Sequence, residues 1–321
     1  MSTEPIKNVA IVGATGRIGG AFAKALAETG KHNVTALVRE DSKGTLPEGV
    51  DVIRVNYDDE VSIVNALKGQ QFLAITLGVQ APSDLHAKIA AAAGKAGVTY
   101  VMPNTFGYPV DSASATGPYD KLVVDRIGDA NNGVSLAVPF CCGFWYEWSL
   151  ATGEQWFGFT IKDRKVTFFD DGKRTVTVST WDQCGRAFAA LFSLPESGSS
   201  PSLTDFKKGV HIYSFQVSQR DMLDSLNRVL GTVDSDWEIR YEPISKRIKD
   251  GAEELANGVF TGFAKMLYGN VFRADNDKSD YASTLMVANE ALALPKEDLD
   301  EATKRTVDMV EGGWSPFENM A

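Results

Sequence analysis

The fold of this 321-residue chain is decided by the segment Val9-Ala10-Ile11-Val12-Gly13-Ala14-Thr15-Gly16-Arg17-Ile18-Gly19-Gly20. Its first four residues are consecutive and apolar and are ended by a glycine, which predicts a buried strand. Phe22, Leu26 and the alanines before Gly30 predict a helix that packs on a sheet. A strand, a glycine-rich turn and a helix in this order are the context in which such a turn binds a dinucleotide. The alternative is a purely structural glycine turn.

The three glycines of this turn have different expected roles. Gly13 permits the tight bend from strand to helix, Gly16 lets the backbone approach a pyrophosphate, and Gly19 lets the helix pack closely on the strand. The N–H groups at the start of the helix would then face the phosphates. The residues expected to bind the dinucleotide here are Gly13, Thr15, Gly16, Arg17, Ile18 and Gly19.

Composition and charge exclude several classes of protein. Hydrophobic residues make up 44% of the chain and charged residues 23%, which is typical of a globular protein and not of a disordered or fibrous one. The net charge of −10 opposes direct binding to DNA, because the phosphates would repel the protein. No apolar run approaches the roughly 20 residues of a membrane span, and the start lacks the pattern of a signal peptide. We therefore expect a cytoplasmic protein that binds neither nucleic acid nor a membrane.

Histidines and cysteines give no pattern for metal binding. The three histidines have none of the spacings of a zinc site, so no metal is expected. Cys141, Cys142 and Cys184 fit neither a disulfide framework nor a zinc site, and we expect them to be buried as small apolar residues. A serine hydrolase is also disfavoured, because no G-x-S-x-G motif occurs.

The first part of the chain alternates strand-like and helix-like segments, as βαβ units do. The candidate strands are residues 9–12, 34–38, 50–55, 72–77, 99–102 and 134–138. The candidate helices are residues 17–28, 59–67, 84–96 and 119–130. This alternation predicts an α/β fold with a Rossmann-type, doubly wound parallel sheet that binds ligands at the carboxyl ends of its strands. We expect this cofactor-binding domain to span residues 1–140.

Residues 141–321 are expected to form a smaller, mixed α/β substrate lobe, whose chain is free to interleave with the first domain. Residues 165–178 alternate like a hairpin around Asp170-Asp171-Gly172. Further expected elements are a helix over 181–194, a surface loop over 195–201, a strand over 211–217 and a strand over 237–244. Ser218 is the predicted N-cap of a helix that ends at Leu230 before Gly231. The remaining chain is expected to be mostly helical.

The end of the second strand distinguishes the two nicotinamide cofactors. An acidic residue there binds the ribose 2′-hydroxyl of NAD, whereas an arginine accommodates the 2′-phosphate of NADP. Here the strand ends in Arg39, which favours NADP(H), with Arg17 and Lys43 as additional cations. Glu40 and Asp41 follow at once and would reverse the preference if the strand ended one residue later.

The motifs Gly13-Ala14-Thr15-Gly16-Arg17-Ile18-Gly19 and Leu37-Val38-Arg39 resemble those of the atypical short-chain dehydrogenases. Within them the chain is similar to the NmrA-like, isoflavone-reductase-like branch, on the further evidence of Asn104-Thr105-Phe106-Gly107 and Lys121. The resemblance covers roughly residues 6–195 and is looser beyond them. It implies a Rossmann fold and NADP(H), since this family contains NADPH-dependent reductases of aromatic compounds. It also contains regulatory proteins that bind the dinucleotide without known catalysis.

Lys121 is the expected proton donor of a reductase. It lies early in the helix after the fifth strand, where the family's reductases carry their catalytic lysine, and an ammonium can protonate a developing alkoxide. The alternative is a surface lysine paired with Asp125 at i,i+4. Tyr119 and His86 are weaker donor candidates, although a lone histidine on a helix is usually exposed. No tyrosine has a lysine four positions on, which excludes the Y-x-x-x-K mechanism.

Other candidate site residues follow the fourth, fifth and sixth strands. The ends of the fourth and fifth strands are expected to border the cofactor through Thr76, Leu77, Gly78, Asn104, Thr105 and Phe106, together with Lys121. An aromatic pocket for the substrate is expected from Phe106, Tyr119, Phe140, Phe144 and Trp145. The alternative for the aromatic residues from Phe140 onward is that they join the two lobes. The alternatives are an ordinary strand-to-loop turn for Phe106 and a surface or loop aromatic for Tyr119.

We expect an NADPH-dependent reductase of a small aromatic or polyketide-like metabolite, with Lys121 as the proton donor. A regulatory protein that senses NADP(H) through a protein partner, without catalysis, is the alternative from a different class. An isomerase or lyase that keeps its nucleotide for structural reasons is a third.

Overall fold

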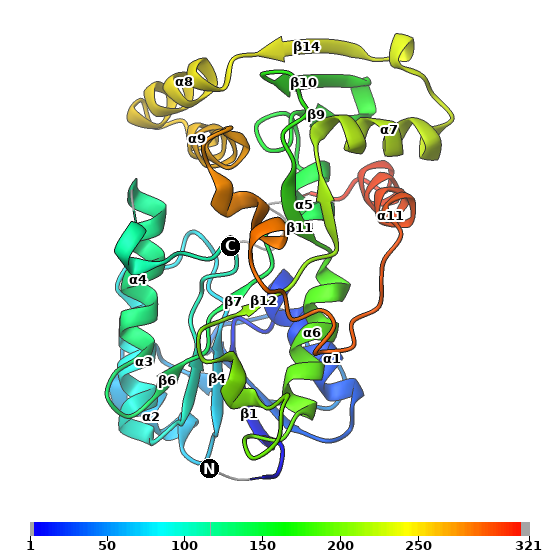
Figure 1. Ribbon diagram of the computed structural model, residues 1–321. Coiled ribbons are helices and arrows are strands. Elements are labelled where there is room, and N and C mark those ends of the chain that lie inside the picture. The colour runs from blue at the N-terminus through cyan, green and yellow to red at the C-terminus, as the bar shows by residue number, and fades with distance from the viewer. Residues whose placement is uncertain (1–2, 116, 316–321) are drawn as a thin grey trace. The chain divides into compact units, whose positions relative to one another are not determined.

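A computed structural model describes residues 3–115 and 117–315 of the protein, which form two compact units (Figure 1). The first unit consists of Met1–Cys141, Trp181–Ile212 and Val287–Leu294. The second consists of Cys142–Thr180, Tyr213–Met286 and Pro295–Ala321. Each unit is therefore assembled from three separate stretches of chain. In the described part of the chain, no helix has both the length and the apolarity that crossing a membrane requires.

A six-stranded parallel sheet in the order β3-β2-β1-β4-β5-β6 organises the first unit. Its strands are β1 Asn8–Val12, β2 Asn33–Arg39, β3 Val50–Val55, β4 Phe72–Ile75, β5 Tyr100–Met102 and β6 Leu136–Ala137. The order of the strands reverses between β1 and β4, and in such sheets ligands bind outside the carboxyl ends at this switch point. The predicted doubly wound sheet is confirmed.

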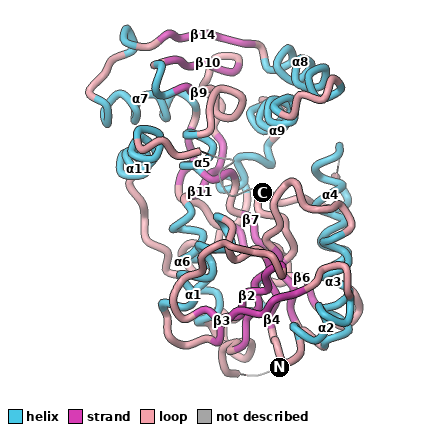
Figure 2. Tube along the Cα trace, turned by 180° about the vertical axis from the view of Figure 1, so that it is seen from behind, coloured by secondary structure: helices cyan, strands magenta, loops and turns pink. Residues whose placement is uncertain are grey.

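Helices cover both faces of this sheet (Figures 1 and 2). One face carries α2 Glu60–Leu67, α3 Leu85–Ala96 and α4 Gly117–Ala130, and the other carries α1 Arg17–Glu28 and α6 Trp181–Ser193. All five were predicted, with boundaries that differ by at most two residues. Their apolar residues recur at helical spacing, so each helix buries one side on the sheet.

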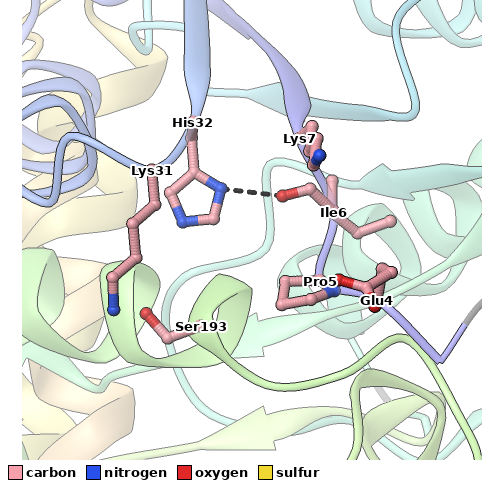
Figure 3. A pocket seen from close by; sticks show the side chains of 7 residues that line it. All are labelled: Glu4, Pro5, Ile6, Lys7, Lys31, His32 and Ser193. Carbon is pink, nitrogen blue, oxygen red and sulfur yellow. Dashed lines mark hydrogen bonds between the residues drawn. The ribbon is translucent and has the colours of Figure 1, made fainter.

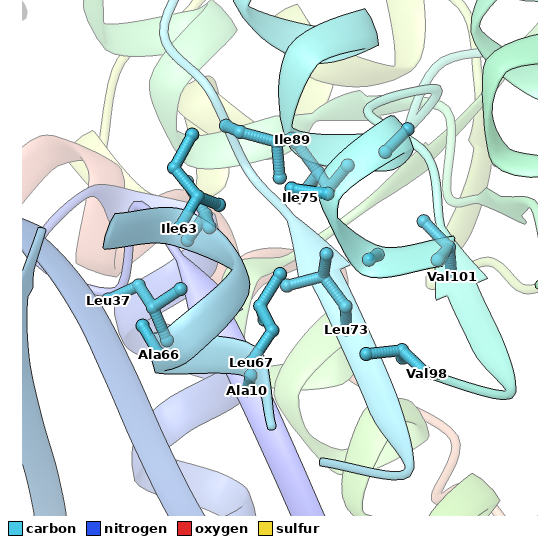
Figure 4. Packing of buried hydrophobic residues seen from close by; sticks show 14 of the residues in the cluster. Ala10, Leu37, Ile63, Ala66, Leu67, Leu73, Ile75, Ile89, Val98 and Val101 are labelled. Carbon is cyan, nitrogen blue, oxygen red and sulfur yellow. The ribbon is translucent and has the colours of Figure 1, made fainter. Parts of the chain in front are cut away.

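The core on the α2 and α3 face consists of aliphatic side chains (Figure 4). Leu37, Leu73 and Ile75 from the strands meet Ile63 and Ile89 from the helices, and all five are at most 1% exposed. This packing fixes the strands whose carboxyl ends form the candidate site.

The core on the other face is aromatic. Phe22 of α1 stacks on Phe188 of α6 with ring centroids 4.2 Å apart. Phe72 of β4 meets Phe192 of α6 edge to face at 4.6 Å. The two helices approach closely, because a Cβ on Gly185 would lie only 2.8 Å from the Ala21 carbonyl oxygen.

The second unit contains two three-stranded sheets, β14-β10-β9 and β13-β11-β8. Their strands are β8 Phe144–Trp145, β9 Phe159–Thr160, β10 Lys165–Phe169, β11 Val176–Ser179, β13 Phe215–Val217 and β14 Glu238–Glu242. The helices of this unit are α5 Tyr146–Ala151, α7 Gln219–Leu230, α8 Ile244–Ala256, α9 Thr261–Phe272, α10 Tyr281–Thr284 and α11 Leu299–Glu311. The predicted caps of α7 are confirmed, since the Ser218 side chain accepts from the Asp221 N–H and Gly231 is left-handed with φ of 64°.

The predicted hairpin around Asp170-Asp171-Gly172 is wrong. β10 pairs with β9 and β14, whereas β11 pairs with β8 and β13. The reason lies at Asp170, whose N–H donates to the Glu242 carbonyl at 2.9 Å and whose Oδ1 accepts from the Ile244 N–H at 3.0 Å. These bonds tie the end of β10 to the chain around β14 and away from β11.

The predicted single strand over residues 211–217 is also divided. Its first part is β12 Val210–His211, which pairs with β7 Phe140–Cys141 in the first unit. Its second part is β13, which pairs with β11 in the second unit. The three cysteines are buried, as predicted.

Candidate cofactor site

The turn after β1 leaves no room for side chains at two of its glycines. Gly13 has φ of +82°, and a Cβ on it would lie 2.2 Å from the Thr76 carbonyl oxygen. A Cβ on Gly19 would lie 2.3 Å from the Gly13 carbonyl oxygen and 2.4 Å from Thr76 Oγ1. Thr76 is held there because its hydroxyl donates to the Val12 carbonyl at 2.6 Å. The expected bend at Gly13 and close packing at Gly19 are confirmed.

The amino end of α1 has the features of an anion site. Gly16 is its N-cap, and in the described part of the chain no side chain caps the helix and no acidic residue lies in its first turn. The first N–H groups of a helix have no partner within the helix and carry its partial positive charge. Thr15 is exposed in the turn, and a Cβ on Gly44 would lie 2.6 Å from its Cβ. Ile18 is buried, and the Arg17 guanidinium lies 5.7 Å from the Trp181 ring centroid.

Arg39 lines a cavity at the carboxyl ends of β2 and β3. It is the last residue of β2, so the acidic residues after it lie outside the strand. Its side chain is 61% exposed, and its Nε lies 3.7 Å from Asp41 Oδ1. The cavity has a volume of about 250 Å³ and is lined by Arg39, Glu40, Asp41, Val55, Asn56, Tyr57 and Asp58.

Sequence reasoning missed three lining residues of this cavity, Asn56, Tyr57 and Asp58. They directly follow β3, which pairs with β2, and their position at the carboxyl end of a neighbouring strand was a usable signal. The Tyr57 hydroxyl donates to the Leu37 carbonyl at 3.0 Å, and burial raises its pKa. Tyr57 thereby fixes one wall of the cavity against β2.

The chain after β4 and the chain after β5 are joined by a hydrogen bond. Asn104 donates through Nδ2 to the Leu77 carbonyl at 2.9 Å. Gly78 is exposed beyond Leu77, whereas Thr105 is 2% exposed. Thr105 Oγ1 is buried and has no hydrogen-bond partner among the described residues. A buried hydroxyl of this kind is unusual in a folded protein.

The aromatic residues expected beside the cofactor lie at different depths. Phe106 is 8% exposed and contacts Phe22 at 5.8 Å and Phe140 at 6.3 Å between ring centroids. Phe140 is completely buried. Tyr119 is half-buried, and its hydroxyl lies so close to Gly107 that a Cβ there would be 2.1 Å away.

Lys121 lies in the second turn of α4. Its side chain is 75% exposed, and its Nζ lies 2.7 Å from Asp125 Oδ2 at i,i+4. This ion pair is the one that the structural alternative for Lys121 predicted. His86 in α3 is only 3% exposed, so the expectation of an exposed histidine is wrong.

Two residues of the expected substrate pocket belong to the second unit. Phe144 packs on Tyr268 with ring centroids 4.4 Å apart. The neighbouring Trp145 has an indole Nε1 that is buried and has no hydrogen-bond partner among the described residues. Trp156 and Phe157 also contact Tyr268, so this aromatic segment forms a cluster within its own unit.

A second cavity lies at the amino ends of β1 and β2, at the edge opposite to the glycine turn (Figure 3). It has a volume of about 230 Å³ and is lined by Glu4, Pro5, Ile6, Lys7, Lys31, His32 and Ser193. His32 Nδ1 donates to the Ile6 carbonyl at 2.7 Å. None of the predicted site residues lines this cavity.

Comparison with known proteins gives one family and several relatives. Residues 5–122 match the model of the NmrA-like family. The chain is 27% identical to oxidoreductase aprR of Aspergillus flavus over 300 residues, which cover 91% of this chain and 96% of that protein.

Solved structures share the fold over nearly the whole chain. A crystal structure of isoflavone reductase matches with a TM-score of 0.70 at 20% identity, covering 94% of this chain and 99% of the other. A structure of AtPrR2 with NADP+ and (+)pinoresinol matches with a TM-score of 0.67 at 16% identity, covering 94% and 99%.

Proposed function

Since the chain belongs to the NmrA-like family, in its isoflavone-reductase-like branch, we propose that it is an NADPH-dependent reductase of a small aromatic or polyketide-like metabolite. The observation that carries the proposal is the turn after β1. Gly13 and Gly19 close against Thr76, and α1 begins without a side-chain cap in the described part of the chain. A pyrophosphate fits such a helix start.

The residues present fit NADP(H). The Gly13–Gly19 turn would hold the pyrophosphate, and Arg39 at the end of β2 would bind the 2′-phosphate, although Glu40, Asp41 and Asp58 line the same cavity. A guanidinium suits a phosphate because it donates charge-assisted hydrogen bonds in a planar fork. Leu77, Gly78, Asn104 and Thr105 would border the nicotinamide half. AtPrR2, whose structure contains NADP+, supports this cofactor.

The reaction requires a proton as well as a hydride. The bound cofactor supplies the hydride. Lys121 would supply the proton from its ammonium group to the oxygen of the reduced carbonyl or enone. The Asp125 carboxylate at 2.7 Å keeps that ammonium oriented, and the exposure of Lys121 lets solvent reprotonate it.

The proposal is tested by NADPH consumption with a panel of aromatic carbonyls and enones, for the wild type and for Lys121→Ala. We expect Lys121→Ala to lower kcat by about 100-fold or more while NADPH binding persists, because general acid catalysis is lost. Lys304→Ala is the matched control, since Lys304 also pairs with an aspartate at i,i+4 and 2.7 Å. Turnover that survives in Lys121→Ala means that another group donates the proton.

The exposed ion pair at Lys121 also favours a second function, a protein that senses NADP(H) without turnover. In that case Lys121 is only a surface residue of α4, and a protein partner recognises the form of the protein that has NADP(H) bound. NADPH binding together with no turnover on any member of the panel would support the sensor.

A further inference from the structure

Asn104 is held by three groups, one from the segment after β4, one from α3 and one from α4. Its Nδ2 donates to the Leu77 carbonyl after β4, and its carbonyl accepts from Arg126 of α4 at 2.6 Å. Its backbone N–H donates to Nε2 of His86 in α3 in a long hydrogen bond of 3.4 Å. Asn104 is therefore fixed through its backbone N–H, its backbone carbonyl and its side chain.

The hydrogen bonds of His86 define its tautomer. Nε2 accepts from the Asn104 N–H, so the ring proton is on Nδ1, which donates to Asp129 Oδ2 at 3.0 Å. Burial lowers the pKa of His86 and the positive charge of Arg126 adds to this, whereas the bond to Asp129 raises it; the net shift is downward and favours the neutral ring that this arrangement requires. In a protonated ring Nε2 would carry a hydrogen, so two donors would face each other and the hydrogen bond from the Asn104 N–H would be lost.

This network lies where the proposed function needs precision. Asn104 and Leu77 follow adjacent parallel strands at the carboxyl edge of the sheet, and Thr105 follows Asn104 directly. Hydride transfer depends steeply on how donor and acceptor are positioned. A group that fixes the Asn104 peptide fixes this border of the cofactor site.

We propose that His86 is a positioning residue of the cofactor site, which holds the Asn104 peptide through Nε2 while Asp129 orients its ring through Nδ1. The proposal rests on the proposed function, because it concerns the site for NADP(H). His86 touches neither cofactor nor substrate and acts only through Asn104.

Two substitutions separate the two ends of the imidazole ring. In His86→Gln the amide oxygen reaches the place of Nε2 and keeps an acceptor for the Asn104 N–H. In His86→Asn the shorter amide reaches the place of Nδ1, keeps the bond to Asp129 and leaves the Asn104 N–H unpaired. Each variant loses one hydrogen bond of the ring, so a merely structural role predicts the same behaviour for both. His32→Asn is the control, because His32 also donates through Nδ1, in its case to the Ile6 carbonyl, but at the opposite edge of the sheet.

The readouts are the Kd of NADPH by fluorescence titration and the hydrogen exchange of the peptide that contains Asn104. We expect His86→Asn to raise the Kd by about tenfold and to speed exchange at Asn104, because a buried N–H loses its acceptor. We expect His86→Gln and His32→Asn to stay within about twofold of the wild type. Equal effects of the two His86 variants on both readouts, or no effect of either, would overturn the proposal. If the wild type itself binds no NADPH, the proposed function fails, and the exchange data still decide whether His86 holds Asn104.

Discussion

Two segments border the same carboxyl edge of the sheet and are held in different ways. The turn between β1 and α1 is held by the absence of side chains, since backbone and hydroxyl atoms fill the places where Gly13 and Gly19 would carry a Cβ. The segment after β5 is held by side chains, through Asn104, His86 and Arg126. The glycine turn therefore has no room for a larger side chain at Gly13 or Gly19. The segment after β5 accepts any substitution that keeps its hydrogen bonds.

The largest effect is expected at the glycine turn. Gly13→Ala or Gly19→Ala should lower the free energy of unfolding by about 3 kcal/mol or more, because the new methyl group overlaps backbone atoms of Gly13 or Thr76. Gly128→Ala is the matched control, since apart from the adjacent backbone of α4 no atom of the described residues lies within 4 Å of its Cβ position. It should raise stability by about 0.5–1 kcal/mol through helix propensity. Denaturant unfolding that gives similar values for the three variants would contradict the packing argument.

A smaller effect is expected at Arg39. Arg39→Ala should weaken NADPH binding by about tenfold or more and leave NADH binding unchanged, because only NADPH carries the 2′-phosphate. Titration of both cofactors measures the change in preference. An equal loss of affinity for NADPH and NADH would mean that Arg39 shapes its cavity but does not bind the 2′-phosphate.

The smallest effect is expected from the titration of His86. Folding keeps this ring neutral, so the unfolded chain binds more protons below pH 6.5 and the free energy of unfolding falls as the pH is lowered from there. Asp129 opposes this effect, and Arg126 adds to it. The wild type should therefore lose more stability between pH 7.5 and 5.5 than His86→Gln, which lacks the group. His32 is present in both proteins, so its contribution to the pH dependence cancels in the comparison. Identical pH profiles of the two proteins would show that His86 does not titrate in this range.

The same contrast explains what the sequence allowed us to predict. The glycine turn is contiguous, and its strand and helix are adjacent in the chain, so local pattern was sufficient. The hydrogen-bond partners of Asn104 are separated from it by 18, 22 and 27 positions in the sequence, and Asp129 is 43 positions from His86. Only the folded sheet brings such residues together.

The second unit was predicted less well for a related reason. Its longer strands, such as β10 and β14, were predicted from the local pattern, but the strand that each one pairs with is decided by residues far away in the sequence. β10 pairs with β14 across more than 60 residues of intervening sequence, and no local pattern signals this.

In the first unit, the cavity residues after β3 were missed although their position beside Arg39 could have been inferred from the strand order.

The aromatic packing of α6 on α1 restricts how this protein can be divided. A fragment that stopped after Cys141 would lose Phe188 and Phe192 and expose the faces of Phe22 and Phe72 to water. Such a fragment would aggregate rather than serve as a minimal nucleotide-binding module. A usable truncation must also carry Trp181–Ile212 and Val287–Leu294, which belong to the same unit, on artificial linkers that replace the residues between them. Residues 142–180 cannot be exchanged alone, because their strands β10 and β11 pair with β14 and β13 from a later stretch of the second unit.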